Sequence, residues 1–267
     1  MSIVTEKIDN GKLKMNFFRF GKGPETLAII PGMSVQSVMP AADQIAAAYS
    51  SFTEDFTVYV FDRRLDMPPV YSVKDMAEDT AQVFMELGLS DVYIFGASQG
   101  GMIALEIATE HPELIKKIAV GSTSSNLRNY SSALFDEWIQ MAENRDVRGL
   151  YLSFGEKLYP RAVFEKFKDT LIASADTVTD EELRRFIICS KGMKGFDISG
   201  QLDKIECPIL VIGVYEDEVL DSDMTMEMAE HLDAKEDFEL YLYKGFGHAA
   251  YDTAPDYVER LYRFYMK

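Results

Sequence analysis

Residues 91–110, DVYIFGASQGGMIALEIATE, indicate how the whole chain is built. Val92 to Phe95 form a short run of β-branched and aromatic residues, which is typical of a strand. Good helix formers resume at Met102. The segment between them, GASQG at 96–100, matches the pattern G-x-S-x-G. We therefore predict a strand that turns sharply into a helix, with Ser98 at the apex in a strained backbone conformation and glycines on either side.

The position of Ser98 suggests its chemistry. The predicted helix begins at the serine, so its first amides and the positive end of its dipole lie near Oγ. This setting suits a hydroxyl oxygen that attacks a substrate. It also suits stabilisation of the oxyanion that then develops. Isolated G-x-S-x-G matches occur by chance, but the strand before this one and the helix after it make the match specific. We interpret Ser98 as a nucleophile; the alternative is a tight structural turn.

The composition is that of a globular protein with a large excess of acidic residues. The chain has 267 residues, of which 47% are hydrophobic and 27% charged, enough for one large α/β domain or a core with an insertion. The net charge of −17 argues against nucleic acid and anionic membrane surfaces as partners. No stretch reaches the ~18 apolar residues that a membrane span needs.

Several features bear on compartment and metal binding. The N-terminal segment MSIVTEKIDNGK has neither a basic n-region nor an apolar h-region, so we expect no secretory signal. Cys189 and Cys207 do not form a C-x-x-C pair, so we expect reduced thiols in a cytoplasmic protein. The three histidines form no cluster with one another or with cysteine, so we predict no metal site.

Strand and helix patterns alternate through the first half of the chain. A hairpin with its turn at Asp9-Asn10-Gly11 is followed by predicted strands at 26–30, 57–61, 92–95 and 117–120. Helical patterns lie between these strands at 40–49, 73–87 and 102–110. This order predicts an α/β fold with a parallel sheet and right-handed crossovers.

The alternation stops after residue 125. Only helical patterns follow, at 132–144, at 162–173 and, behind a predicted capping box of Thr179 and Glu182, at 179–190. Strands return at 209–212 and 238–243, with a helix at 224–232 and a closing helix from Pro255. We predict a core of residues 1–125 and 199–267 and a helical insertion of residues 126–198 that forms a cap, or lid, over Ser98. The alternative is a rigid helical appendage packed on the side of the sheet, with Ser98 open to bulk solvent.

A serine nucleophile needs a base within hydrogen-bonding distance. His111 ends the helix that starts at Ser98, and His231 lies in a polar, acidic run, so neither is placed to reach the serine. His248 follows the strand that ends at Tyr243, in a glycine-rich loop. Ligand sites of parallel sheets lie outside the carboxyl ends of the strands. We therefore predict His248 as the base; the alternative is an ordinary loop histidine.

An acid that orients this histidine should follow another strand. The loop after the strand 209–212 contains Glu216, Asp217 and Glu218. We favour Asp217, with Glu216 as the alternative that spacing does not exclude. The order Ser98, Asp217, His248 is the order of nucleophile, acid and base in α/β-hydrolases.

These segments together carry a resemblance to a known superfamily. The turn GASQGG, the strand and loop CPILVIGVYED at 207–217 and the loop GFGHAAY at 245–251 are similar to those of the α/β-hydrolase fold superfamily, over nearly the whole chain. The resemblance implies an eight-stranded, mostly parallel sheet, with the helical cap inserted after the sixth strand. It also implies oxyanion donors at the backbone amides of Gln99 and Met33. One departure is DRRLDMPP at 62–69, where relatives often have Gly-His-Gly-x-Ser.

The leading hypothesis is a cofactor-free serine hydrolase that cleaves a small, apolar ester or other acyl substrate. An acyltransferase with the same triad and a hydrolase-fold ligand sensor with little turnover are the alternatives, and a homodimer stays open. Arg63 and Arg64 either bind a substrate carboxylate or pair with a nearby aspartate. A set of apolar residues in the insertion either lines an acyl pocket or packs the insertion on the core: Phe135, Met141, Phe154 and Met193.

Overall fold

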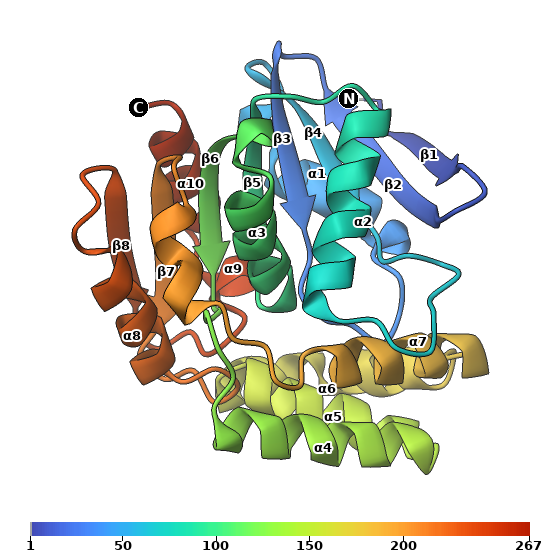
Figure 1. The fold of residues 1–267 in the computed structure, drawn as a ribbon. Helices are drawn as coiled ribbons and strands as arrows, with labels where there is room; N and C mark the ends of the chain where they lie inside the picture. Colours follow the sequence, from blue (N-terminus) through green and yellow to red (C-terminus); the bar gives the residue numbers. More distant parts are fainter. Residues whose placement is uncertain (1) are drawn as a thin grey trace.

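The computed structural model describes residues 2–267, without the side chain of Tyr130; Met1, where the predicted core begins, lies outside it. Its centre is an eight-stranded sheet in the order β1-β2-β4-β3-β5-β6-β7-β8 (Figure 1). The strands are β1 (Val4–Asp9), β2 (Lys14–Gly21), β3 (Glu25–Ile30), β4 (Phe56–Phe61), β5 (Val92–Ala97), β6 (Ile115–Gly121), β7 (Ile209–Val214) and β8 (Phe238–Tyr243). β2 pairs antiparallel with β1 and β4, and the other neighbours pair in parallel. The predicted fold class is therefore confirmed.

Helices cover both faces of the sheet. α2 (Val73–Glu86), α3 (Gln99–Glu110) and α8 (Ser222–Leu232) lie on one face, and α1 (Ala42–Ala48) and α10 (Tyr257–Tyr265) lie on the other (Figure 1). Alternate residues of β3 enter the two cores: Ala28 and Ile30 pack on the α3 side, and Leu27 and Ile29 on the α10 side. Because both faces are covered, β5 and β7 are buried along their whole length.

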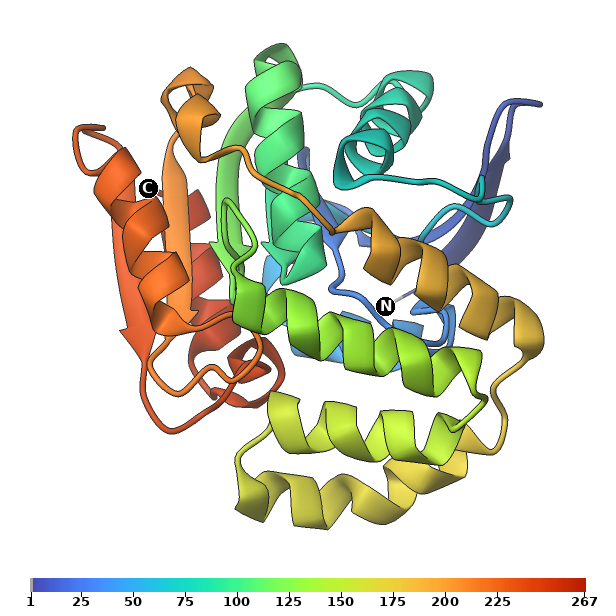
Figure 2. The same ribbon diagram turned by 60° about the horizontal axis from the view of Figure 1, so that its bottom comes forward.

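Four helices follow β6: α4 (Asn129–Glu143), α5 (Val147–Leu158), α6 (Arg161–Ala175) and α7 (Asp180–Gly192). They lie across the carboxyl ends of the parallel strands (Figure 1, Figure 2). The predicted capping box of α7 is confirmed, because Thr179 Oγ1 accepts from the Glu182 amide and Glu182 Oε2 accepts from the Thr179 amide. Helix α5 was not predicted, although Leu150, Phe154 and Leu158 recur at a helical spacing.

The two ends of the helical insertion lie side by side. Asn126 and Asp197 form an antiparallel bridge, and the Ile198 amide donates to the Ser125 carbonyl at 2.8 Å. The chain therefore leaves the sheet and returns to it at one point. Among residues 2–267, no helix is long and apolar enough to cross a membrane.

Candidate active site

Ser98 occupies the sharp turn between β5 and α3. Its backbone has φ 53° and ψ −122°, a conformation that costs a residue with a Cβ about 1–3 kcal/mol. The neighbouring glycines make the turn possible. A Cβ at Gly96 would lie 2.3 Å from the Gly100 carbonyl oxygen, and a Cβ at Gly100 would lie 2.0 Å from the Ile30 carbonyl oxygen. The strained turn and its need for glycine are thus present as predicted.

The end of β6 holds this turn in place. The Ser98 amide donates to the Gly121 carbonyl at 2.9 Å, and the Ser98 carbonyl accepts from Thr123 Oγ1 at 2.7 Å. The Ser98 carbonyl also accepts from the amides of Gly101 and Met102, which starts the helix. The hydroxyl of Ser98 is thereby presented on a backbone that is fixed from two sides.

His248 lies in the loop after β8 and is almost fully buried, with 2% of its surface exposed. Its Nδ1 lies 2.8 Å from Asp217 Oδ2 and 2.9 Å from Asp217 Oδ1. A carboxylate only accepts, so in the neutral imidazole Nδ1 is the nitrogen that carries the proton and Nε2 is the one with the lone pair. Asp217 Oδ1 also accepts from the amides of Val219 and Leu220, at 2.8 and 3.0 Å. These bonds hold the carboxylate in position next to Nδ1 of the imidazole.

The structure separates Asp217 from its sequence alternatives. Glu216, the main rival, accepts from the Gly245 amide at 2.7 Å and has no contact with His248 among the interactions described. The other histidines lie elsewhere: His111, at the far end of α3, contacts Glu78 at 2.9 Å, and His231 is exposed on α8. The described hydrogen bonds to His248 Nδ1 are those of Asp217.

The two predicted oxyanion donors lie next to Ser98. Gln99 is the first residue of α3, where amides have no carbonyl partner within the helix. Met33 follows Gly32, at which a Cβ would lie 3.2 Å from the Cβ of Ser98. Met33 and Ser98 line the same cavity. Two backbone amides thus belong to segments that meet at the serine.

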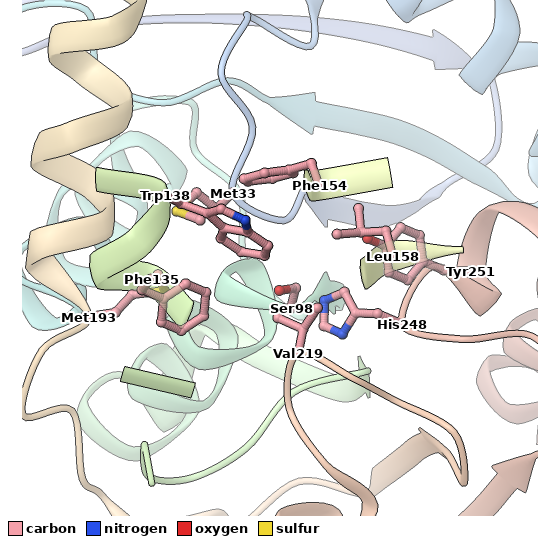
Figure 3. Close-up of a pocket in the computed structure, with 10 residues that line it drawn as sticks. All are labelled: Met33, Ser98, Phe135, Trp138, Phe154, Leu158, Met193, Val219, His248 and Tyr251. Carbon is pink, nitrogen blue, oxygen red and sulfur yellow. The ribbon is translucent and has the colours of Figure 1, made fainter. Parts of the chain in front are cut away.

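One cavity brings the sheet and the insertion together (Figure 3). The space not filled by atoms there is about 290 Å³, which includes open solvent, and the cavity is lined by Met33, Ser98, Phe135, Trp138, Phe154, Leu158, Met193, Val219, His248 and Tyr251. Ser98 and His248 lie side by side in it, with aromatic rings from α4 and α5 on the opposite side. Burial raises the pKa of the Tyr251 phenol well above its usual range, so it stays neutral. None of these lining residues is Asp, Glu, Lys or Arg.

The two arginines after β4 form ion pairs and hydrogen bonds with other residues of the protein. Arg64 pairs with Asp66 and Asp79, each at 3.1 Å. Arg63 donates from Nη2 to the Pro31 carbonyl at 2.5 Å and from Nε to Gln99 Oε1 at 3.2 Å. Neither arginine is among the residues that line the described cavity.

Part of the cavity wall was predicted from the sequence. Phe135, Phe154 and Met193 line it, whereas Met141 packs against the core instead. Leu158, Val219 and Tyr251 were not named as wall residues. Val219 lies two residues after Asp217, and Tyr251 lies three residues after His248. Their proximity in sequence to predicted site residues could have indicated that they line the cavity.

The fold and this arrangement define the class of protein as an α/β-hydrolase. The chain belongs to the family described as "Serine aminopeptidase, S33", whose model matches residues 67–252. The family is one of hydrolases, so a hydrolase activity is supported.

Individual relatives cover most of the chain at low identity. "Putative carbamate hydrolase RutD" of Rhizobium rhizogenes is 25% identical over an alignment of 199 residues that covers 72% of this chain and 76% of the relative. The solved structure of MGS-M2, an α/β-hydrolase enzyme from a Medee basin deep-sea metagenome library, has a TM-score of 0.87, 20% identity and 98% coverage of both chains. The enol-lactonase from Burkholderia xenovorans LB400 has a TM-score of 0.81 at 16% identity, over 98% of this chain and 100% of that one. At these identities, the two structures show a shared fold.

Proposed function

We propose that this protein is a cofactor-free serine hydrolase, which cleaves a small ester or other acyl substrate through a covalent acyl-enzyme. The observation that carries the proposal is the placement of His248. Its Nδ1 lies 2.8 Å from Asp217 Oδ2, and its ring shares an apolar cavity with Ser98. Nucleophile, base and orienting acid are the three groups that acyl transfer by a serine requires.

In the first step, Ser98 Oγ attacks the substrate carbonyl while His248 Nε2 takes the hydroxyl proton. Asp217 keeps the proton on Nδ1 and stabilises the imidazolium that forms. The amides of Met33 and Gln99 donate to the oxyanion, an interaction that strengthens as negative charge develops. His248 then protonates the leaving group. A water molecule activated by the same Nε2 releases the acid and restores Ser98.

The helical insertion acts in this proposal as a lid and acyl pocket. Phe135 and Trp138 of α4 and Phe154 of α5 face the reactive side chains across the cavity (Figure 3). An apolar wall excludes bulk water, which strengthens the oxyanion contacts. The absence of Asp, Glu, Lys and Arg from the lining residues supports a substrate whose acyl part is small, apolar and uncharged.

A carbamate is the second candidate for the substrate, because a relative at 25% identity is named as a carbamate hydrolase. The same attack on the carbonyl would give a carbamoyl-enzyme. The cavity favours a neutral carbamate ester over a free carbamate anion, since no Lys or Arg side chain lines it to pair with an anion.

A substrate panel with mass spectrometry tests the proposal. Purified protein is assayed with p-nitrophenyl acetate, butyrate and dimethylcarbamate and with a small lactone, and intact mass is recorded on the turnover timescale. We expect sustained release of p-nitrophenol and acyl adducts that map to Ser98. A single burst without turnover would favour a sensor, and transfer to added alcohol in preference to water would favour an acyltransferase. No adduct with any substrate would reject the proposal.

A further inference from the structure

A partly buried polar cluster lies next to the two proposed oxyanion residues, and Arg63 is at its centre. We propose that Arg63 is a positioning residue, which holds the segment of Met33 and the segment of Gln99 in the geometry that oxyanion binding needs. The inference rests on the proposed serine hydrolase function. Arg63 lies outside the cavity lining, so it acts through other groups and not on substrate.

The Arg63 side chain joins the two segments directly. Nη2 donates to the carbonyl of Pro31 at 2.5 Å, two residues before Met33. Nε donates to the side-chain oxygen of Gln99 at 3.2 Å. The guanidinium is planar and rigid, so two bonds from one fork fix the orientation of both acceptors. Lysine has a single ammonium on a flexible stem and lacks this geometry.

The Arg63 backbone is itself held from two sides. Its amide donates to Asp62 Oδ1 at 2.8 Å, and its carbonyl accepts from Arg185 Nη2 of α7 at 3.2 Å. Asp62 is 6% exposed, and its Oδ2 accepts from the Ser37 hydroxyl at 2.6 Å. Arg63 is therefore a fixed point from which the two segments are held, and not a mobile surface arginine.

Helix α7 completes the cluster. Gln99 Nε2 donates to the Cys189 carbonyl at 3.0 Å, so both ends of the Gln99 amide side chain are bonded. The hydroxyl of Ser190 lies 3.0 Å from the sulfur of Met33. Both proposed oxyanion residues thus contact α7 through their side chains. The geometry of the two amides depends on a network that spans the core and the insertion.

The cluster also carries an excess of positive charge. Two guanidinium groups, those of Arg63 and Arg185, lie near one buried carboxylate, Asp62, with Arg185 at 3.9 Å from it. Burial lowers the pKa of Arg63, but an arginine remains protonated at neutral pH. Burial raises the pKa of the Cys189 thiol to about 11, so it adds no negative charge. Positive charge in a poorly solvated region favours an oxyanion nearby.

The test compares Arg63→Met with Arg64→Met. The neighbouring arginine is a matched control, because it loses the same group and two ion pairs but does not contact the oxyanion segments. We expect Arg63→Met to lower kcat for p-nitrophenyl butyrate by about 10- to 100-fold with little change in KM. Affinity for butyl trifluoromethyl ketone, whose adduct carries an oxyanion, should fall by the same factor as kcat/KM. Arg64→Met should change thermal stability but neither kinetic constant.

If Arg63→Met folds poorly, two further variants test the role of Arg63. Arg63→Lys keeps the charge without the fork, and we expect it to fold and to recover only part of kcat. The double variant Arg63→Met/Gln99→Leu should be less impaired than the product of the single effects, because both changes break one network. Wild-type kcat and ketone affinity in either Arg63 variant would overturn the inference. An inactive wild-type protein would reject the proposed function, and the inference with it.

Discussion

The sheet and the helical insertion contribute to the same cavity in different ways. Loops that follow β5 and β8 supply Ser98 and His248, and the loop after β7 supplies Asp217 behind them. Helices α4 and α5 supply only apolar wall residues, among them Trp138 and Phe154. The proposed reactive groups thus depend on backbone geometry at strand ends, whereas the wall depends on side-chain packing. Chemistry and selectivity are therefore expected to respond to different substitutions.

The two regions also differ in how tightly each position is constrained. At the turn around Ser98, a single Cβ on Gly96 or Gly100 would meet backbone atoms at 2.3 or 2.0 Å. In the insertion, a large side chain such as Phe167 is 48% exposed. Substitutions at the turn are therefore expected to abolish activity, and substitutions in the insertion to adjust it.

Ser98→Ala should give the largest effect. Alanine keeps the Cβ and the backbone conformation but removes the nucleophile, so we expect hydrolysis of the best substrate to fall by about 10³-fold or more. Circular dichroism and thermal unfolding should match those of the wild type. Most of the activity remaining, with a folded protein, would show that the sheet does not supply the nucleophile at this position.

The orienting acid should give the next largest effect. Asp217→Asn removes the carboxylate that fixes the His248 tautomer at 2.8 Å, and we expect kcat to fall by at least about 10²-fold. Glu216→Gln is the matched control in the same loop. Its partner is the Gly245 amide, for which a glutamine oxygen is also an acceptor, so the activity should change little.

The kinetic constants of both variants, measured on one ester, decide between the two carboxylates. Equal losses, or a larger loss for Glu216→Gln, would show that the hydrogen bond to His248 is not the one that matters for catalysis. Because neither change alters the insertion, the relative rates on acetate and butyrate esters should stay as in the wild type.

This division also explains what the sequence could predict. The turn at Ser98, the loop of His248 and the acidic loop after β7 each follow a strand pattern, and parallel strands bring their carboxyl ends to one edge. Strand periodicity therefore predicts which residues meet. Spacing could not separate Asp217 from Glu216, because that choice depends on which side chain turns inward within one loop.

The cavity wall was harder to predict. Phe135, Phe154 and Met193 line the cavity but Met141 does not, and all four are apolar residues of helical segments. The faces of a helix that point to a cavity and to a core look alike in sequence, because both are apolar. The role of Arg63 was equally hidden, since its partners at Pro31 and Gln99 are about thirty residues away in either direction along the chain.

A change in the insertion should alter selectivity more than rate. Phe154 lies on the cavity wall with its ring 4.1 Å from that of Trp138. We expect Phe154→Ala to change the ratio of kcat/KM for p-nitrophenyl butyrate over acetate by about 10-fold, because apolar wall contacts discriminate acyl chains at roughly 1–3 kcal/mol per methylene. Phe167→Ala is the matched control, since that ring belongs to α6 and does not line the cavity. An equal change in both variants would mean that the insertion acts through its stability and not as the wall.

The smallest expected effect is that of Glu106→Gln, a change in the sheet core that should alter thermal stability and leave kcat unchanged. Glu106 lies on α3, about 12 Å along the helix from Ser98, and is 6% exposed. Burial raises the pKa of its carboxyl in the folded state. The folded protein therefore holds this proton more tightly than the unfolded chain, whose glutamate titrates near pH ~4.3. The stabilising contribution is fully present below that pH and is lost as the pH rises through the folded pKa.

Glu106→Gln removes the titration, so its melting temperature relative to wild type should rise from pH 4 upward and then level off, with kcat unchanged. The control Glu110→Gln makes the same change at an exposed carboxylate of α3 that pairs with Lys74 at 3.1 Å, and its kcat should also be unchanged. A Glu106→Gln difference that is constant from pH 4 to 8 would contradict the argument, and a loss of kcat would mean that the buried end of α3 is coupled to the site after all.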